Sequence, residues 1–242
     1  MEFPLSVVDS ILACGIVVIG ATLQGSIGFG MGPFAVPLLL LIDPVFIPGP
    51  LLAAAVIITF LIYRREQHAV KTIEVKWAIA GRLVGTVLGA VFLRFFPQNH
   101  LTLFFGMMVI LSLVFFAGGF HVPITTRNLF SAGSLSGFMG ITSSIGGAPM
   151  ALLYHKEEGP RLRGTLSGVF VIGTIIAITS LVIIGRFGLR ELLSALVLYP
   201  GVLIGFYLSN HTSKILDRGF IRPTVLIVSG FSAVLLIVRY FQ

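Results

Sequence analysis

The sequence predicts an all-α membrane protein with about eight transmembrane segments in two inverted repeats, each opening with a Gly-rich broken helical hairpin. Two observations lead to this prediction. The 242-residue chain is 56% hydrophobic and only 10% charged, whereas charged residues make up about a quarter of an ordinary soluble domain. A pattern of Gly and Pro also recurs at a fixed spacing, and doubled backbone breaks in apolar segments are typical of transporters built from two halves.

The repeat has a spacing of 116 residues and needs no gap. The matching positions hold mostly Gly and Pro, which determine backbone geometry and add little bulk. The matched pairs are Gly30/Gly146, Pro33/Pro149, Ala35/Ala151, Gly85/Gly201, Gly89/Gly205, Phe104/Phe220 and Val109/Val225. Because the whole layout recurs, we assign residues 1–118 to the first repeat, 119–128 to the inter-repeat loop and 129–242 to the second repeat.

The first repeat begins with an apolar stretch, Leu5–Leu23, which ends at the Gly-rich break Gln24–Pro33. A short apolar piece follows the break and reaches Ile42. Three longer stretches complete this half: Pro44–Ile62, Trp77–Phe96 and Leu101–Phe120. They approach or exceed the roughly 18 apolar residues that mark a membrane helix.

The second repeat has the same order of elements. It opens with Leu129–Ile141, continues through the break Thr142–Pro149, and has a short piece that reaches Tyr154. Three apolar spans then follow: Gly164–Gly185, Leu192–Ser209 and Pro223–Val238. We therefore predict that each half forms one interrupted hairpin and three further membrane crossings.

Two threadings of the breaks compete. In one, the short apolar piece and the next span form a single broken crossing, and the repeats are parallel. In the other, the segments around each break form a hairpin, and the repeats are inverted. The hairpin threading places 11 Lys and Arg residues on one side and 4 on the other, with Arg82 left out, whereas the parallel threading divides them 8 to 7. Because positive residues favour the cytoplasm, we predict a multi-pass inner-membrane protein with loop 63–76 inside and both termini extracytoplasmic.

The two breaks predict a substrate site between the repeats, because irregular backbone inside a bilayer must be buried in protein or line a watery cavity. A short helix should begin near Pro33 and near Pro149, and the N–H groups of a helix start attract anions. Side-chain donors accompany these helix starts. The candidate substrate-binding residues are Gln24, Ser26, Gly28, Gly30, Pro33, Thr142, Ser143, Ser144, Gly146, Gly147, Pro149 and Arg82.

The alternative role for glycine in a membrane bundle is close helix packing. We favour packing for Gly85, Gly89, Gly201 and Gly205, which form pairs spaced by four residues. Arg82 also has two interpretations. It lies six residues beyond Lys76, about 9 Å into its span, where its side chain would extend to the interface by default or contact an anion directly.

The composition also excludes several functions. The spans contain almost no Asp, Glu or His apart from Asp9 and Asp43 near predicted ends, and proton or sodium carriers usually place such groups along their path. We therefore expect a small anionic substrate, and no metal or cofactor. The net charge of +7 lies in short loops, which indicates orientation in the lipid bilayer and not nucleic-acid binding. No catalytic motif is present, and Cys14 has no cysteine partner.

The segment Gly30–Leu39, a Gly-rich break followed by Pro-x-x-x-Pro-Leu-Leu, resembles the first-repeat signature of the sulfite exporter TauE/SafE family. The segment Ser144–Pro149 resembles it again. The resemblance implies a secondary transporter that exports small sulfur-containing anions such as sulfite or organosulfonates across the inner membrane. A passive anion channel, or another membrane binding protein without coupled transport, is the alternative. Leu153 stands opposite Pro37, which leaves open whether the two half-sites are equivalent.

Overall fold

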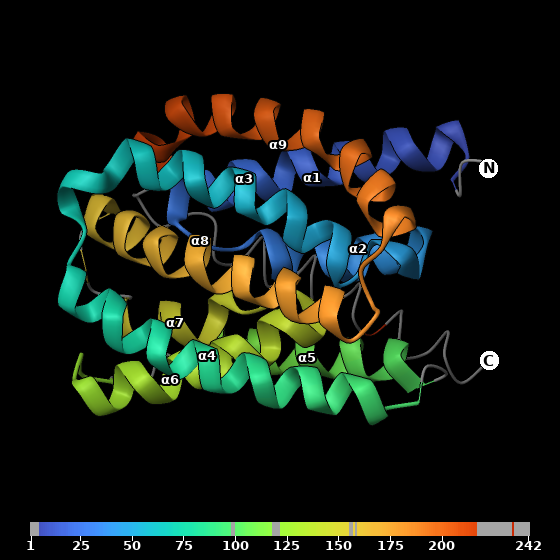
Figure 1. Ribbon diagram of the computed structural model, residues 1–242. Coiled ribbons are helices and arrows are strands. Elements are labelled where there is room, and N and C mark those ends of the chain that lie inside the picture. Colours follow the sequence, from blue (N-terminus) through green and yellow to red (C-terminus); the bar gives the residue numbers. More distant parts are fainter. Residues whose placement is uncertain are drawn as a thin grey trace.

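The computed structural model describes residues 5–97, 100–117, 122–154, 157, 159–216 and 234, and all regular structure in this part is helical (Figure 1). The helices are α1 (Val7–Ile27), α2 (Met31–Ile42), α3 (Gly49–Glu66), α4 (Thr72–Phe95), α5 (Leu101–Ala117), α6 (Thr126–Ser143), α7 (Gly147–Tyr154), α8 (Gly159–Ile183) and α9 (Leu189–Leu216). Short 3-10 turns, η1 (Pro44–Phe46) and η2 (Gln67–Ala69), precede α3 and α4. The predicted span Pro223–Val238 lies almost entirely outside the described residues.

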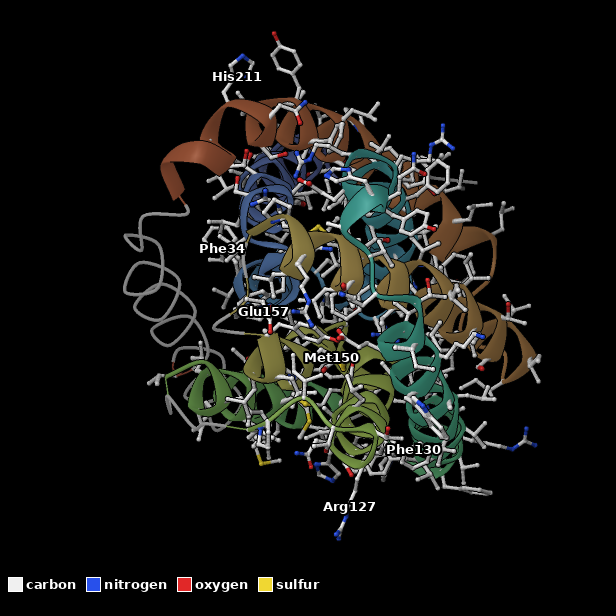
Figure 2. The ribbon with its side chains drawn as sticks, turned by 90° about the vertical axis from the view of Figure 1, so that its left-hand side faces the viewer. Phe34, Arg127, Phe130, Met150, Glu157 and His211 are labelled. Carbon is white, nitrogen blue, oxygen red and sulfur yellow. The ribbon has the colours of Figure 1, made fainter. Side chains whose placement is uncertain are left out.

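Four of these helices, α1, α4, α8 and α9, are long and apolar enough to cross a membrane. Two more, α2 and α5, are apolar but shorter. Figure 2, which views the molecule from one end of the helices, shows Met150 in the interior, whereas Arg127 and His211 project outward. The fold is therefore an all-helical bundle with membrane-length helices.

The helix boundaries on either side of the two breaks repeat at the sequence spacing. Helix α1 ends at Ile27 and α6 ends at Ser143, while α2 begins at Met31 and α7 begins at Gly147. The residue after each first helix is left-handed, Gly28 with φ 87° and Ser144 with φ 61°. Each break is thus only three residues long, 28–30 and 144–146.

These breaks are shorter than the sequence predicts. Helix α1 continues through Gln24 and Ser26, and α6 continues through Thr142, because apolar neighbours and helical hydrogen bonds outweigh the weak helix preference of Ser, Thr and Gly. Pro33 and Pro149 are the third residues of α2 and α7. Their missing N–H groups cost nothing there, since the first N–H groups of a helix have no intrahelical partner.

The chain turns back on itself at each break. A Cβ on Gly20 would lie 3.1 Å from Cγ of Met31, so α2 begins beside the middle of α1 and not beside its end. In the second half, Ser136 Oγ donates to the carbonyl oxygen of Gly146 at 2.5 Å, ten residues later in the chain. In Figure 1, α2 runs back along α1.

The two halves pack through corresponding helices. Helix α4 lies along α6 and α1 lies along α9, while α3 lies along α8. Figure 1 shows α3 and α8 running in opposite directions, and α4 and α9 likewise. Since α1 corresponds to α6 and α4 to α9 at the 116-residue spacing, the same contacts occur twice.

The glycine pairs lie at close helix–helix contacts, as the sequence predicts. A Cβ on Gly85 would collide with the carbonyl of Ser134, and one on Gly201 would lie 2.6 Å from the carbonyl oxygen of Cys14. Gly205 lies equally close to the carbonyl of Val18. Helices α4 and α6, and α1 and α9, therefore approach closely because these positions carry no side chain.

Ion pairs join the loops at one end of the molecule. Arg163 Nε lies 2.9 Å from Glu66 Oε1, and Arg161 Nη2 lies 2.8 Å from Glu74 Oε1. The α3–α4 connection and the α7–α8 connection therefore lie at the same end, which we call the basic end. At the opposite end, Arg186 donates to the carbonyl of Leu93 at 2.7 Å.

Candidate anion site

The two breaks cross each other in the centre of the bundle. A Cβ on Gly147 would lie 3.2 Å from Cβ of Phe29, and a Cβ on Gly32 would lie 3.2 Å from Cα of Ile145 and closer still to the carbonyl of Ser144. Phe29 and Ile145 are corresponding residues, so each break rests against the start of the other short helix. This reciprocal contact brings the two Gly-rich segments together.

A cavity of about 40 Å³ lies where the breaks meet. The polar and glycine residues that line it are Gln24, Gly30, Gly32, Thr59, Arg82, Gly140, Ser144, Gly146, Gly147 and Thr174. Pro33 and a set of apolar residues, Phe29, Met31, Leu51, Leu52, Ala55 and Phe170, complete the wall. A volume of this size holds only a few water molecules.

Arg82 is the one charged residue among the described residues of this wall. It comes from α4, and only 3% of it is exposed. Its Nη1 atom donates to Ser136 Oγ at 2.8 Å and its Nη2 atom to Thr174 Oγ1 at 3.4 Å. The guanidinium carbon also lies 5.0 Å from the ring centre of Phe170, within cation–π range.

The charge of Arg82 has no acidic partner among the described residues, since none of their carboxylates lies within 4.0 Å of it. Its Nε atom is buried without a hydrogen-bond partner. Buried charges in proteins are normally paired or bind a charged ligand. The guanidinium is therefore a buried positive charge beside a cavity.

Of the two interpretations of Arg82, the default one, extension to the membrane interface, is wrong, because only 3% of the residue is exposed. Glycines on two neighbouring helices leave space for the side chain inside the bundle. A Cβ on Gly173 of α8 would overlap the guanidinium, and one on Gly140 of α6 would lie 3.2 Å from Nη2. The side chain therefore turns inward, because the room and the hydroxyl partners lie there.

The starts of α2 and α7 add positive potential at the same place. The N-cap of α2 is Gly30, with φ 118°, and a residue with a Cβ would be strained in this conformation. The first helical hydrogen bond of α2 runs from Phe34 N to Gly30 O at 3.1 Å, so the N–H groups of Met31 and Gly32 precede the helical ladder. Each helix start corresponds to about half a positive charge.

The structure brings together seven of the twelve candidate residues. The residues that line the cavity are Gln24, Gly30, Pro33, Arg82, Ser144, Gly146 and Gly147. Those that lie outside its wall are Ser26, Gly28, Thr142, Ser143 and Pro149. Three of the five excluded residues, Ser26, Thr142 and Ser143, are helical residues whose hydroxyls face their own helix.

The three hydroxyls outside the cavity bond to their own helices. Ser26 donates to Thr22 O at 2.7 Å, Thr142 to Phe138 O at 2.7 Å, and Ser143 to Met139 O at 2.8 Å. Such bonds to the preceding turn are the usual way a helical Ser or Thr is satisfied. These side chains therefore have their donor in use within the helix.

Ser144 differs from its neighbours because it ends α6 in the left-handed conformation. Its hydroxyl donates to the carbonyl of Pro48, at the start of α3, at 2.9 Å. It lines the cavity and links the two halves.

Sequence reasoning missed the partners of Arg82. Ser136 and Thr174 lie within α6 and α8, away from the two Gly-rich breaks. Their only signal is a hydroxyl within an apolar span, which is common in membrane helices. Phe170 carries no signal at all, because an aromatic residue in an apolar helix is ordinary.

Interrupted helices that meet in the interior are how secondary transporters build a site within the bilayer. Together with the membrane-length helices, they place this protein in the class of multi-pass membrane transporters. The sequence matches the profile of the sulfite exporter TauE/SafE family over residues 12–236, and the chain belongs to this family. Since the family consists of transporters, the protein is not an enzyme. Searches of curated proteins and of solved structures found no match.

Proposed function

We propose that the protein is a secondary transporter that exports small sulfur-containing anions, such as sulfite or organosulfonates, across the inner membrane. The observation that carries this proposal is Arg82, a buried guanidinium without an acidic partner among the described residues, at the crossing of two helix starts. The family supports the substrate class.

The electrostatics favour an anion at this point. A charged residue at the bilayer centre costs about 2.5–3.5 kcal/mol even on lenient scales, and an anionic ligand beside Arg82 would offset part of that cost. The first residues of the two short helices, Met31 and Gly147, line the same cavity. A cation would be repelled by all three groups.

We also propose that the two halves are inverted repeats and that the complete chain has eight membrane segments. The opposite directions of α3 and α8 in Figure 1, and the recurrence of corresponding contacts, support this arrangement. The basic end would face the cytoplasm by the positive-inside rule. Alternating access would then be a rocking of one half against the other around the cavity.

A passive anion channel is the second candidate. The small volume of the cavity favours a carrier, because a pore needs a continuous path in one conformation. In liposomes loaded with labelled sulfite, a carrier should show saturable efflux that external sulfite accelerates by exchange. Linear efflux without acceleration would support the channel and contradict our proposal.

A further inference from the structure

We infer that three charged residues at the basic end, Arg65, Glu66 and Arg163, form the gate that closes the central cavity toward that side. We call them the ion-pair network. This inference rests on the proposed function, because a gate has a role only if substrate passes through the cavity. The network lies away from the cavity wall and contains none of the candidate anion ligands.

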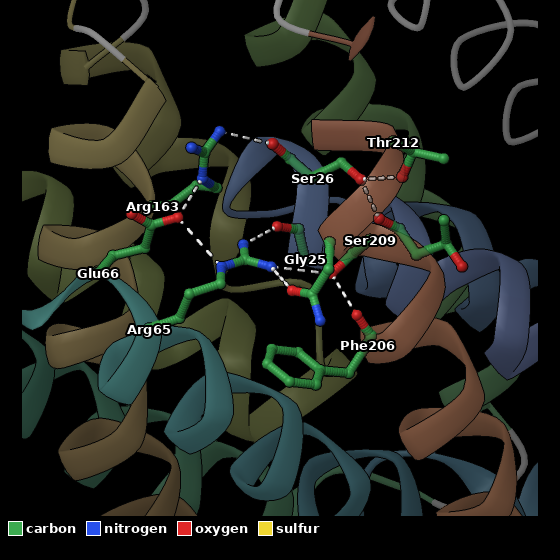
Figure 3. Close-up of polar contacts among 10 residues, drawn as sticks. Gly25, Ser26, Arg65, Glu66, Arg163, Phe206, Ser209 and Thr212 are labelled. Atoms are coloured by element: carbon green, nitrogen blue, oxygen red, sulfur yellow. Dashed lines mark hydrogen bonds and ion pairs between the residues drawn. The ribbon is translucent and has the colours of Figure 1, made fainter. Parts of the chain in front are cut away.

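One carboxylate oxygen holds both guanidinium groups together (Figure 3). Glu66 Oε1 lies 2.9 Å from Nε of Arg163 and 3.1 Å from Nε of Arg65. Glu66 and Arg163 are only 7% and 5% exposed. Buried and charge-assisted bonds of this kind are stronger than surface ion pairs.

Both arginines also bind the end of α1. Arg163 donates to the carbonyl of Ser26 at 3.0 Å, and Arg65 donates to the carbonyl of Gly25. The C-terminal end of a helix attracts cations, since its carbonyls are unpaired and its dipole is negative there. Arg65 further donates to Asn210 Oδ1 of α9 at 2.7 Å. The network therefore joins α1 and α3 of the first half to α8 and α9 of the second.

The network lies at the basic end, close to the residues that line the cavity on that side. Gln24 lines the cavity and is followed by Gly25. Thr59 lines it too, and Arg65 lies six residues further along α3, about 9 Å away along the helix axis. Phe29 lines the cavity as well. A Cβ on Gly28, which precedes it, would lie 3.1 Å from Cα of Arg163. A path that runs along α1 and α3 from the cavity to the basic end must therefore separate these groups.

Among the described residues, the opposite end has no corresponding ion pairs. At the 116-residue spacing, Arg65, Glu66 and Arg163 correspond to Leu181, Val182 and Ile47. The corresponding contact between a break and the opposite half is the single hydroxyl bond from Ser144 to Pro48. Opening toward the basic end therefore requires the separation of a buried ion pair, whereas the described contacts at the other end are hydrogen bonds to carbonyls, from Ser144 to Pro48 and from Arg186 to Leu93. The network should bias the resting protein against the state that is open at the basic end.

The test measures access to the cavity and needs no substrate. Thr59→Cys in a Cys14→Ser background provides a reporter in the cavity wall, and its rate of reaction with a membrane-impermeant thiol reagent is measured in right-side-out and inverted vesicles. Glu66→Gln keeps the shape of the side chain and removes the charge that both arginines share. We expect labelling from the basic end to become about tenfold faster. A rise of this size is expected if the conformer that is open at the basic end increases from a few per cent of the protein to a major fraction.

Arg64→Gln is the matched control, because Arg64 lies in the same helical turn, is exposed and is outside the network. It should leave the labelling rate unchanged. An unchanged labelling rate in Glu66→Gln, or an equal increase in the rate from both ends, would contradict the proposed gate. If Glu66→Gln does not purify as folded protein, Arg65→Gln, which leaves the pair between Glu66 and Arg163, should give a smaller increase from the basic end only, and no increase would reject the proposal.

The labelling result separates the gate from the proposed function. Faster labelling from the basic end without any transport of sulfite or sulfonate would support the gate and contradict the proposed substrate class. Active transport combined with unchanged labelling would reject the gate alone.

Discussion

Arg82 of the first half holds the second break through Ser136. Its guanidinium donates to Ser136 Oγ at 2.8 Å, and that hydroxyl donates in turn to the carbonyl of Gly146 at 2.5 Å. The charge and the backbone break are thus parts of one hydrogen-bonded chain. Any anion that draws the guanidinium into the cavity would act on the break as well.

Arg82→Gln should weaken the binding of sulfite by on the order of 10- to 100-fold, because hydrogen bonds to charged groups contribute about 1.5–3 kcal/mol. The measurement is the shift in melting temperature of the purified protein as sulfite is titrated, with sulfonates, sulfate and carboxylates for comparison. Arg82→Lys keeps the charge and should retain part of the affinity. Unchanged affinity for sulfite in Arg82→Gln would show that Arg82 does not contribute to substrate binding.

Gly30→Leu and Gly146→Leu should abolish substrate-dependent stabilisation. At Gly30 the left-handed backbone penalises any side chain by about 1–2 kcal/mol, and at Gly146 a Cβ would lie 2.6 Å from the carbonyl of Ser136. Gly89→Ala, in the α4–α6 contact, should instead lower the melting temperature and leave affinity intact. Retained affinity for the substrate in both variants would indicate that Gly30 and Gly146 serve helix packing only.

Two adjacent serines allow a matched comparison. Ser144→Ala removes the hydroxyl that links the second break to Pro48, whereas Ser143→Ala removes one that bonds to its own helix. We expect Ser144→Ala to alter the rate of sulfite efflux from liposomes severalfold, and Ser143→Ala to leave it near the wild-type rate. Equal effects of the two changes would show that the break hydroxyl has no special role.

The topology predicts that the α3–α4 and α7–α8 connections face the cytoplasm. Single cysteines at Gln67 and at Gly159, in a Cys14→Ala background, should both be protected from an impermeant thiol reagent in intact cells and both react after lysis. Reaction of Gly159→Cys from outside, with Gln67→Cys protected, would contradict the ion pairs that place these loops at one end.

The driving force should be the membrane potential or an exchanged anion. A monovalent anion that leaves the cell gains about 2.3 kcal/mol per 100 mV of inside-negative potential. Efflux of labelled sulfite from liposomes should therefore accelerate when a potassium gradient makes the interior negative. Efflux that ignores the potential and depends only on an imposed pH gradient would instead direct attention to Asp9 and Asp43 as proton carriers.

The sequence by itself determined the class of the protein and the places where the chain breaks. A long apolar run is a local property, and so is a Gly-Pro cluster that interrupts it, so the breaks near Gly30 and Gly146 and the packing of Gly85 against a neighbouring helix could be predicted without a structure. The 116-residue spacing added the correspondence between the halves.

Only the tertiary structure decided which polar groups serve the cavity. Thr142 and Ser143 sit beside a break in the sequence yet bond within α6, while Arg82 turns inward because Gly173, 91 residues later, leaves it space. The pairing of Glu66 with Arg163 likewise joins the ends of two distant helices. The physical reason is that burial and hydrogen bonding of a side chain depend on what a neighbouring helix offers, and helix-to-helix register is set by packing over long sequence separations, not by local pattern.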